Sequence, residues 1–200
     1  MRLGVLASGS GTNLQAIIDA VEAKKLPAEI AVVVSDNAQA PALERARKHR
    51  YKHICLNPRN YKGREEYDAA LVSLLQRERV GLVVLAGFMR LLSRYFVREY
   101  EGRITNIHPS LLPAFPGLNA VQQALKYGVK ITGCTVHFVD EGVDTGPIIA
   151  QVAVAVKEGD TVETLHQRIH SAEHKLYPWA LGLICRGKVR VEGRRCIISD

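Results

Sequence analysis

Aromatic residues, cysteines and long hydrophobic runs are all scarce in this chain of 200 residues. Aromatic side chains account for 6% of the sequence, which disfavours a protein that binds single-stranded nucleic acid by stacking its bases. The four cysteines form no Cys-x-x-Cys pair, which disfavours structural zinc and a disulfide framework and suits a reducing compartment. No run reaches the roughly 18 apolar residues of a membrane span, and the apolar stretch after Met1 is too short for a signal peptide. We therefore expect a cytoplasmic protein that does not bind membranes.

The composition is that of a folded globular protein with an excess of positive charge. Apolar residues make up 47% and charged residues 24%, which excludes disordered and fibrous classes, and the length favours one domain over residues 1–200. Lysine and arginine number 27 against 20 acidic residues, a formal charge of +7. The excess leaves two classes of partner open, a nucleic acid and a small anionic ligand. We interpret the basic runs at 45–52 and 186–195 as solvated faces.

Strand-like apolar runs alternate with amphipathic segments along the chain. Strands are predicted at residues 2–7, 30–34, 80–86, 103–107, 132–139 and 148–156, with a hairpin or edge strand at 188–199. Helices are predicted at residues 14–21, 41–48, 64–78, 93–100, 120–126 and from 160 onward, the last with Asp160 and Glu163 as a capping box. The alternation predicts an α/β fold, an open, mostly parallel twisted sheet with helices on both faces. Such sheets bind ligands beyond the carboxyl ends of their strands.

The turn after the first strand, Ser8-Gly9-Ser10-Gly11-Thr12-Asn13, is a candidate anion site. Its small residues allow backbone amides to approach an anion at the start of the next helix. The spacing matches neither a dinucleotide fingerprint nor a Walker loop nor a nucleophile elbow. We interpret the turn as a monophosphate cradle; the alternative is a tight turn with Asn13 as the helix cap.

Asn106 and His108 form a second candidate site where the strand at 103–107 should leave the sheet. Their spacing puts both side chains on one face of the strand. A carboxamide beside an imidazole suits acyl transfer, because the amide stabilises an oxyanion and the imidazole carries charge or a proton. The alternative is a buried, hydrogen-bonded histidine beside a turn-forming asparagine.

The glycine-flanked loop that begins at Asp140 offers carboxylates that could complete this site. Asp140, Glu141 and Asp144 all lie in it, and an aspartate near His108 would favour the protonated imidazole by charge pairing. The alternative is a solvated hairpin loop. A hydrolase triad of Ser110, His108 and Asp144 is disfavoured, because a serine two residues from its own base is poorly placed for attack.

His166, His170 and His174 recur on one face of the last predicted helix. Residues 170–174 match the His-x-x-Glu-His pattern of inverted zinc proteases. Three ligands along one straight helix would span about 12 Å, too far for one tetrahedral zinc ion. We expect no metal here and a histidine that reaches a polar substrate instead.

These segments together resemble the glycinamide ribonucleotide formyltransferases, a family of folate-dependent enzymes of purine synthesis. The resemblance covers nearly the whole chain. It rests on residues 8–17, 84–90, 106–113, 136–139 and 144–147, of which Asn-Ile-His-Pro-Ser-Leu-Leu-Pro at 106–113 is the most specific. The phosphate loop and the late Glu173-His174 pair narrow the likeness to this family among the formyltransferases.

The resemblance implies a role for each of the matching residues. Catalysis would fall to Asn106, His108 and Asp144. The ribonucleotide would be bound by Gly11, Thr12, Asn13, His170 and Glu173. The folate would be bound by Arg64, Met89, Arg90, Leu91, Leu92, Asn106, Asp140, Glu141, Gly142, Val143 and Asp144.

The resemblance also implies a Rossmann-like core with 10-formyltetrahydrofolate as co-substrate and no metal. Residues 1–100 would form the half that binds the ribonucleotide phosphate, and residues 101–200 the half that binds folate and carries out catalysis. The partners would be these small molecules and not nucleic acid, with the protein a monomer or a homodimer. The chain departs from the family at Asn119, where some members have histidine, and at His170, where others have glutamine.

Two related enzymes and one RNA-binding module are alternatives to this function. Methionyl-tRNA formyltransferase would carry an additional C-terminal domain, and formyltetrahydrofolate deformylase an additional N-terminal one, so the length disfavours both. A basic RNA-binding module is the alternative from a different class, and steep salt dependence of RNA binding would support it.

Overall fold

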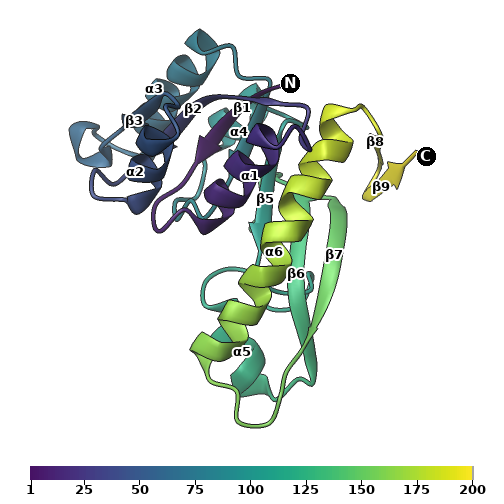
Figure 1. Ribbon diagram of the computed structural model, residues 1–200. Coiled ribbons are helices and arrows are strands. Elements are labelled where there is room, and N and C mark those ends of the chain that lie inside the picture. Colours follow the sequence, from purple (N-terminus) through teal and green to yellow (C-terminus); the bar gives the residue numbers. More distant parts are fainter. Residues whose placement is uncertain (200) are drawn as a thin grey trace. The chain divides into compact units, whose positions relative to one another are not determined.

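The computed structural model describes residues 1–199 and divides into two compact units, Met1–Thr105 and the part from Asn106 onward. Strands and helices alternate through the first unit, as the sequence predicts (Figure 1). None of the helices in residues 1–199 is both long and apolar enough to span a membrane.

The first unit is built on parallel strands. Its strands are β1 (Arg2–Leu6), β2 (Glu29–Ser35), β3 (His53–Cys55), β4 (Leu82–Leu85) and the start of β5 (Ile104–His108). The hydrogen-bonded order is β3-β2-β1-β4, followed by β5. Val5 of β1 lies between Val33 of β2 and Val84 of β4, and all three are fully buried. The strand β3 is an addition to the prediction, because its three residues are too few for a periodic signal.

Helices of the first unit form two packed pairs. They are α1 (Thr12–Glu22), α2 (Pro41–Lys48), α3 (Arg64–Arg77) and α4 (Arg94–Glu99), with a short 3₁₀ turn η1 (Pro58–Asn60). α1 contacts α2, and α3 contacts α4. The chain reverses its direction across the sheet between β3 and β4, so right-handed crossovers place α1 and α2 on one face and α3 on the other.

The second unit combines the end of β5 with antiparallel strands and one long helix. Its further elements are α5 (Ala120–Tyr127), β6 (Ile131–Phe138), β7 (Ile148–Ala155), α6 (Val162–Cys185), β8 (Val189–Glu192) and β9 (Arg195–Ile198). The strand order is β5-β6-β7-β9-β8, and α6 packs on β6, β7 and α5. β6 pairs with β7, and β8 with β9, in antiparallel fashion, because the short loop between β6 and β7 leaves no room for a crossover. The fold class is therefore confirmed: the sheet is open and mostly parallel, with these antiparallel pairs at one end.

The structure contradicts one alternative helix cap, Asn13 of α1, and one predicted cap, the Asp160–Glu163 pair of α6. Gly11, in the left-handed region at φ 70°, precedes the first residue of α1, so Asn13 lies inside the helix instead of capping it. Thr161 caps α6 in a reciprocal pair with Thr164. Asp160 accepts two hydrogen bonds from the Arg168 guanidinium instead, at 2.8 and 2.9 Å.

Candidate active site

Asn106, His108 and Asp144 meet in the second unit. Asn106 and His108 project from the end of β5, and Asp144 comes from the loop between β6 and β7. The Nδ1 atom of His108 lies 3.2 Å from Oδ2 of Asp144, and Nδ2 of Asn106 lies 3.4 Å from Oδ1 of the same carboxylate. His108 is 5% exposed, so the cluster is an amide, an imidazole and a carboxylate in a largely desolvated setting.

Both ring nitrogens of His108 face hydrogen-bond acceptors. Nε2 lies 2.8 Å from the carbonyl oxygen of Phe115, and Nδ1 faces the Asp144 carboxylate. A doubly protonated ring, which has two N–H donors, satisfies both partners. The geometry is thus suited to an imidazolium held by a carboxylate.

Asp144 is held as an ionised carboxylate. Burial by itself raises the pKa of this carboxyl, but hydrogen bonds from His137 and the Gly117 amide, together with the charges of His108 and His137, lower it below its ordinary value. The Gly117 N–H donates to Oδ2 at 2.8 Å. The backbone of Asp144 is in the left-handed region at φ 54°, a conformation that turns its side chain toward the cluster at a cost in backbone energy.

His137 is a member of the cluster that the sequence reasoning missed. Its Nε2 atom lies 3.3 Å from Nδ2 of Asn106 and 3.5 Å from Oδ1 of Asp144. Its Nδ1 atom lies 2.8 Å from the carbonyl oxygen of Phe138. The available signal was position alone, since His137 is near the end of β6, the strand beside β5 in the sheet order.

Asp140 organises the loop that carries Asp144. Its Oδ1 atom accepts hydrogen bonds from the Gly142 amide at 3.0 Å and from the Thr145 hydroxyl at 2.6 Å. Of the predicted folate residues in this loop, Glu141, Gly142 and Val143 are exposed, whereas Asp140 and Asp144 are half-buried. The loop joins the antiparallel strands β6 and β7 as a hairpin and is held by these internal hydrogen bonds.

Ser110 does not form a hydrolase triad with His108. The serine is fully buried, and its hydroxyl donates to the carbonyl oxygen of Ala114 at 2.5 Å. Asn119, the first departure from the family pattern, precedes α5 in the left-handed region at φ 59°. Asparagine tolerates that conformation better than most residues.

In the first unit, the turn at 8–13 is supported by α2. The amide of Ala42 donates to the Gly9 carbonyl at 3.2 Å, and a Cβ atom on Gly11 would lie 2.8 Å from Cα of Ala42. Arg45 Nε donates to the Ser10 carbonyl at 2.8 Å. Arg45 is therefore a structural part of this turn, and the interpretation of Arg45 as a solvated residue is wrong.

The other predicted folate residues of the first unit lie at its surface. Arg64 begins α3 and is exposed. Met89 and Leu91 are 66% and 61% exposed, in the segment that follows β4, whereas Arg90 and Leu92 are half-buried.

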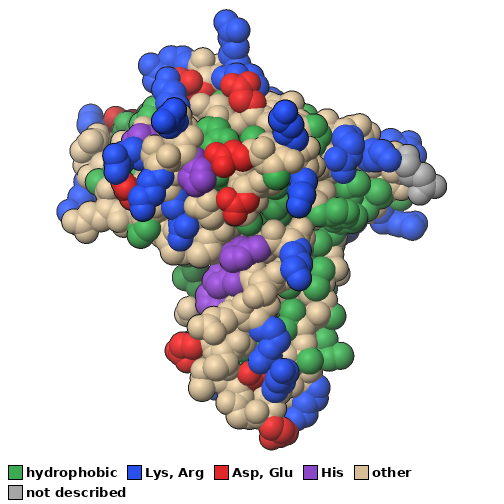
Figure 2. All heavy atoms as spheres, in the orientation of Figure 1, with side chains coloured by type: hydrophobic (Ala, Val, Ile, Leu, Met, Phe, Trp, Pro, Cys, Tyr) green, Lys and Arg blue, Asp and Glu red, His purple; other side chains and the backbone are tan. Residues whose placement is uncertain are grey.

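Histidine side chains gather along α6 (Figure 2). The ring centroids of His166 and His170 are 4.1 Å apart, and those of His170 and His174 are 5.9 Å apart. His170 Nδ1 lies 2.7 Å from Oε2 of Glu173, whose side chain is buried. This hydrogen bond raises the pKa of His170, whereas burial and the charge of His170 lower the pKa of His166. Within residues 1–199 no group of three histidine, cysteine or acidic residues is arranged to hold a metal.

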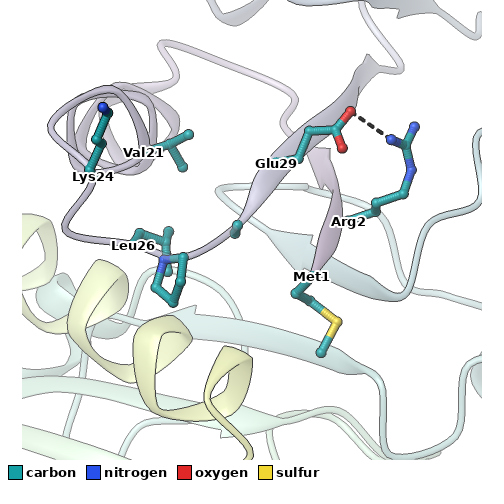
Figure 3. Close-up of a pocket in the computed structure, with 8 residues that line it drawn as sticks. Met1, Arg2, Val21, Lys24, Leu26 and Glu29 are labelled. Atoms are coloured by element: carbon teal, nitrogen blue, oxygen red, sulfur yellow. Dashed lines mark hydrogen bonds and ion pairs between the residues drawn. The ribbon is translucent and has the colours of Figure 1, made fainter.

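An open cavity of about 480 Å³ lies elsewhere in the first unit (Figure 3). It is lined at one side by Met1, Arg2 and Glu29, where β1 and β2 begin, and Arg2 pairs with Glu29 at 2.6 Å. Ligands of parallel sheets bind at the carboxyl ends of the strands. The cavity is at the amino ends, so we do not assign the active site to it.

A model of the family described as formyl transferase matches residues 1–181. The chain belongs to the formyl transferase family. This formyl transferase chain is 46% identical to the phosphoribosylglycinamide formyltransferase of Bacillus subtilis, an alignment that covers 94% of this chain and 98% of the relative. It is 48% identical to the trifunctional purine biosynthetic protein adenosine-3 of Bos taurus. The alignment covers 100% of this chain but only 20% of that relative.

Among solved structures, this formyl transferase resembles glycinamide ribonucleotide transformylase 1 from Symbiobacterium toebii. The identity is 54% and the TM-score 0.99, with 100% of this chain and 94% of the other covered. A formyltetrahydrofolate deformylase from Pseudomonas syringae is more distant, at 28% identity and a TM-score of 0.92, and the match covers 100% of this chain and 66% of the deformylase.

Proposed function

We propose that this chain transfers the formyl group of 10-formyltetrahydrofolate to the amine of 5-phosphoribosylglycinamide, a step of purine synthesis. The observation that carries the proposal is the buried cluster of Asn106, His108 and Asp144. Membership of the formyl transferase family and the names of the most similar relatives support it.

The chemistry is direct transfer without a covalent enzyme intermediate. The amine lone pair attacks the formyl carbon, a new C–N bond forms, and the formyl oxygen becomes an oxyanion. The Asn106 amide and the protonated His108 ring donate hydrogen bonds to that oxygen. To receive the His108 bond, the oxygen replaces the Phe115 carbonyl at Nε2, while Nδ1 keeps its contact with Asp144.

Asp144 has two functions in this scheme. As a carboxylate of lowered pKa, it stabilises the imidazolium throughout the reaction. With a water molecule, it also helps to move one proton from the attacking nitrogen to N10 of the folate. The bond from carbon to N10 then breaks, the formyl carbonyl re-forms, and tetrahydrofolate leaves with its nitrogen protonated.

The two substrates carry negative charge at opposite ends, and the proposed binding residues match them. Gly11, Thr12 and Asn13 form an amide-rich helix start for the phosphate, His170 supplies a cation to the ribonucleotide, and Glu173 binds the ribose. Arg64 pairs with the glutamate carboxylate of the folate. Met89–Leu92 and Asp140–Asp144 each contribute to binding of the pterin.

The test is a formyl-transfer assay with 5-phosphoribosylglycinamide as acceptor, compared with water alone. We expect transfer, and we expect His108→Ala and Asp144→Ala each to lower turnover by roughly 10²-fold or more, as loss of a main oxyanion or proton-transfer group does. His53→Ala, which changes an exposed histidine outside the cluster, is the matched control and should retain wild-type turnover.

Two results would contradict the proposal. Near-normal turnover of both cluster variants would exclude the assigned mechanism. Hydrolysis of the formyl folate in water without transfer would instead indicate a deformylase, the function of the more distant structural relative.

A further inference from the structure

The segment from Gly87 to Ser93 is anchored at its two ends and exposed in its middle. It has no regular secondary structure and connects β4 to α4. Phe88 and Ser93 are buried, whereas Met89 and Leu91 are exposed. Because no strand or helix fixes this backbone, its conformation depends on hydrogen bonds from the rest of the unit.

Ser8 holds the first end of the segment. Its backbone amide donates to the Gly87 carbonyl at 2.9 Å, and its hydroxyl oxygen accepts a hydrogen bond from the Met89 amide at 2.9 Å. Ser8 is also the first residue of the turn at 8–13. The two segments proposed to bind the two substrates are thus joined by a pair of hydrogen bonds.

Asp68 holds the second end. This aspartate lies on α3, is 2% exposed, and accepts a hydrogen bond from the Ser93 amide at Oδ2, at 2.5 Å. Ser93 in turn caps α4 by accepting from the Phe96 amide. Burial raises the pKa of Asp68, while the hydrogen bonds of Ser93 and the charges of Arg64 and Arg90 act in the opposite direction.

The residue beside Asp68 holds the middle of the segment. Tyr67 is fully buried, and the Arg90 guanidinium lies over its ring, 4.7 Å from the centroid. Such a cation–π contact is attractive, because the face of an aromatic ring carries negative potential. Two consecutive residues of α3, Tyr67 and Asp68, therefore contact the segment at two places.

We propose that Asp68 is a positioning residue for the reduced folate, which fixes the backbone of Met89–Leu92 in the conformation that binds the pterin. This inference rests on the proposed function for the identity of the ligand. Asp68 does not touch the substrate in this scheme. It acts through Ser93, whose amide donates to its carboxylate.

The experiment compares Asp68→Ala, Asp68→Asn and Leu75→Ala in the full-length chain. Alanine removes the acceptor of the Ser93 amide, whereas asparagine keeps a carbonyl acceptor and removes the charge. Leu75 is fully buried on the same helix, and its side chain lies beside Gly4 of β1, so its truncation should destabilise α3 at its contact with β1. Melting temperatures of the two alanine variants test whether both are folded and comparably destabilised.

The readouts are the Kd for tetrahydrofolate, the KM for each substrate, and amide exchange at Ser93. Loss of a hydrogen bond to a buried carboxylate should raise the folate Kd and KM about tenfold in Asp68→Ala. The ribonucleotide KM should stay within about twofold, Asp68→Asn should recover part of the folate affinity, and only Asp68→Ala should lose Ser93 protection. Leu75→Ala should keep the wild-type ratio of the two KM values.

Other results would contradict either the positioning role of Asp68 or the proposed function. The positioning role is wrong if Asp68→Ala binds tetrahydrofolate as the wild type does. It is also wrong if Leu75→Ala raises the folate KM relative to the ribonucleotide KM as much as Asp68→Ala does. If the wild type binds tetrahydrofolate but does not transfer formyl to the ribonucleotide, the proposed function fails, and the Kd values still test Asp68. A wild type that binds no reduced folate overturns both.

Discussion

At the scale of single residues, the buried histidines of the candidate site share one carboxylate. His108 and His137 are almost wholly buried, and both contact the Asp144 carboxylate. An isolated charge in such surroundings would cost several kcal/mol. Carboxylate, imidazole and amide together distribute that charge over hydrogen bonds, so removal of Asp144 leaves His108 without its charge partner.

His170 should make binding of the ribonucleotide depend on pH. Its pKa is raised by the hydrogen bond to Glu173, so it is cationic below about pH 6.5, the ordinary value, and loses its charge as the pH rises through the raised value. The substrate phosphate has its second ionisation near pH 6. Above about pH 6.5 it is therefore mostly a dianion, while His170 loses its charge. We therefore expect the KM for the ribonucleotide to increase with pH above about 6.5.

The measurement is the KM for each substrate between pH 6 and 9 in the wild type and in His170→Gln. Glutamine keeps a hydrogen-bond donor without a titrating charge, so the ribonucleotide profile should become flat. His53→Gln, at an exposed position, is the control and should keep the wild-type slope. An unchanged slope in His170→Gln would show that another group is responsible.

The sequence predicts site residues correctly where their spacing within one strand decides which way the side chains point. Asn106 and His108, two positions apart at a strand end, were expected on one face, and they meet the same carboxylate. His137 and Arg45 were missed because their partners, Asp144 and Ser10, are distant in sequence. No local pattern carries such contacts; they depend on which strands and helices become neighbours.

At the scale of elements, the turn at 8–13 shows how a helix start is fixed by a second helix. α2 donates an amide and a guanidinium N–H to two carbonyls of the turn. Gly11 is pressed against Ala42 in a left-handed conformation. That conformation costs a residue with a side chain about 1 kcal/mol or more, so glycine is required there for two separate reasons.

Gly11→Ala should weaken ribonucleotide binding, because its Cβ atom would force the turn away from α2. Backbone strain and overpacking together amount to about 2–4 kcal/mol, which predicts a lower melting temperature and a ribonucleotide KM raised at least tenfold. Gly9→Ala is the matched control in the same turn, since a Cβ there meets no atom within 4 Å. KM values and thermal melts of both variants test this. Equal effects at the two glycines would contradict it.

The elements also show where prediction from pattern ends. The apolar runs of β1 and β4 and the proline at the start of α2 located those elements closely. The antiparallel pairing of β6 and β7 was not predicted, since apolar residues alone do not give strand direction and the connecting loop decides it. The predicted cap of α6 was misplaced, because several polar residues at its start can cap and the reciprocal hydrogen bonds of Thr161 and Thr164 form instead.

At the scale of the whole molecule, the net charge of +7 has two interpretations, an anionic ligand pair or a nucleic acid. Arg45 is an example of a cation used inside the protein. It belongs to the basic run at 45–52, but its guanidinium supports the proposed phosphate turn through the Ser10 carbonyl. Arg168 is likewise committed to Asp160, where hydrogen bonds from its guanidinium strongly lower the pKa of the carboxyl. Charges that are engaged within the protein are not available as a general surface for nucleic acid.

The two interpretations predict different effects on thermal stability. A ligand at about 100 times its Kd stabilises the native state by about 2.7 kcal/mol, which for a chain of this size raises Tm by roughly 5–10 °C. We expect shifts of this size with 5-phosphoribosylglycinamide and with tetrahydrofolate, saturating with concentration and nearly unchanged between 50 and 200 mM salt. A single-stranded RNA oligomer should give no saturable shift. If RNA stabilised the protein more than either small molecule, and its affinity fell steeply with salt, then the positive charge would mark a nucleic-acid surface and the substrate assignment would lose its support.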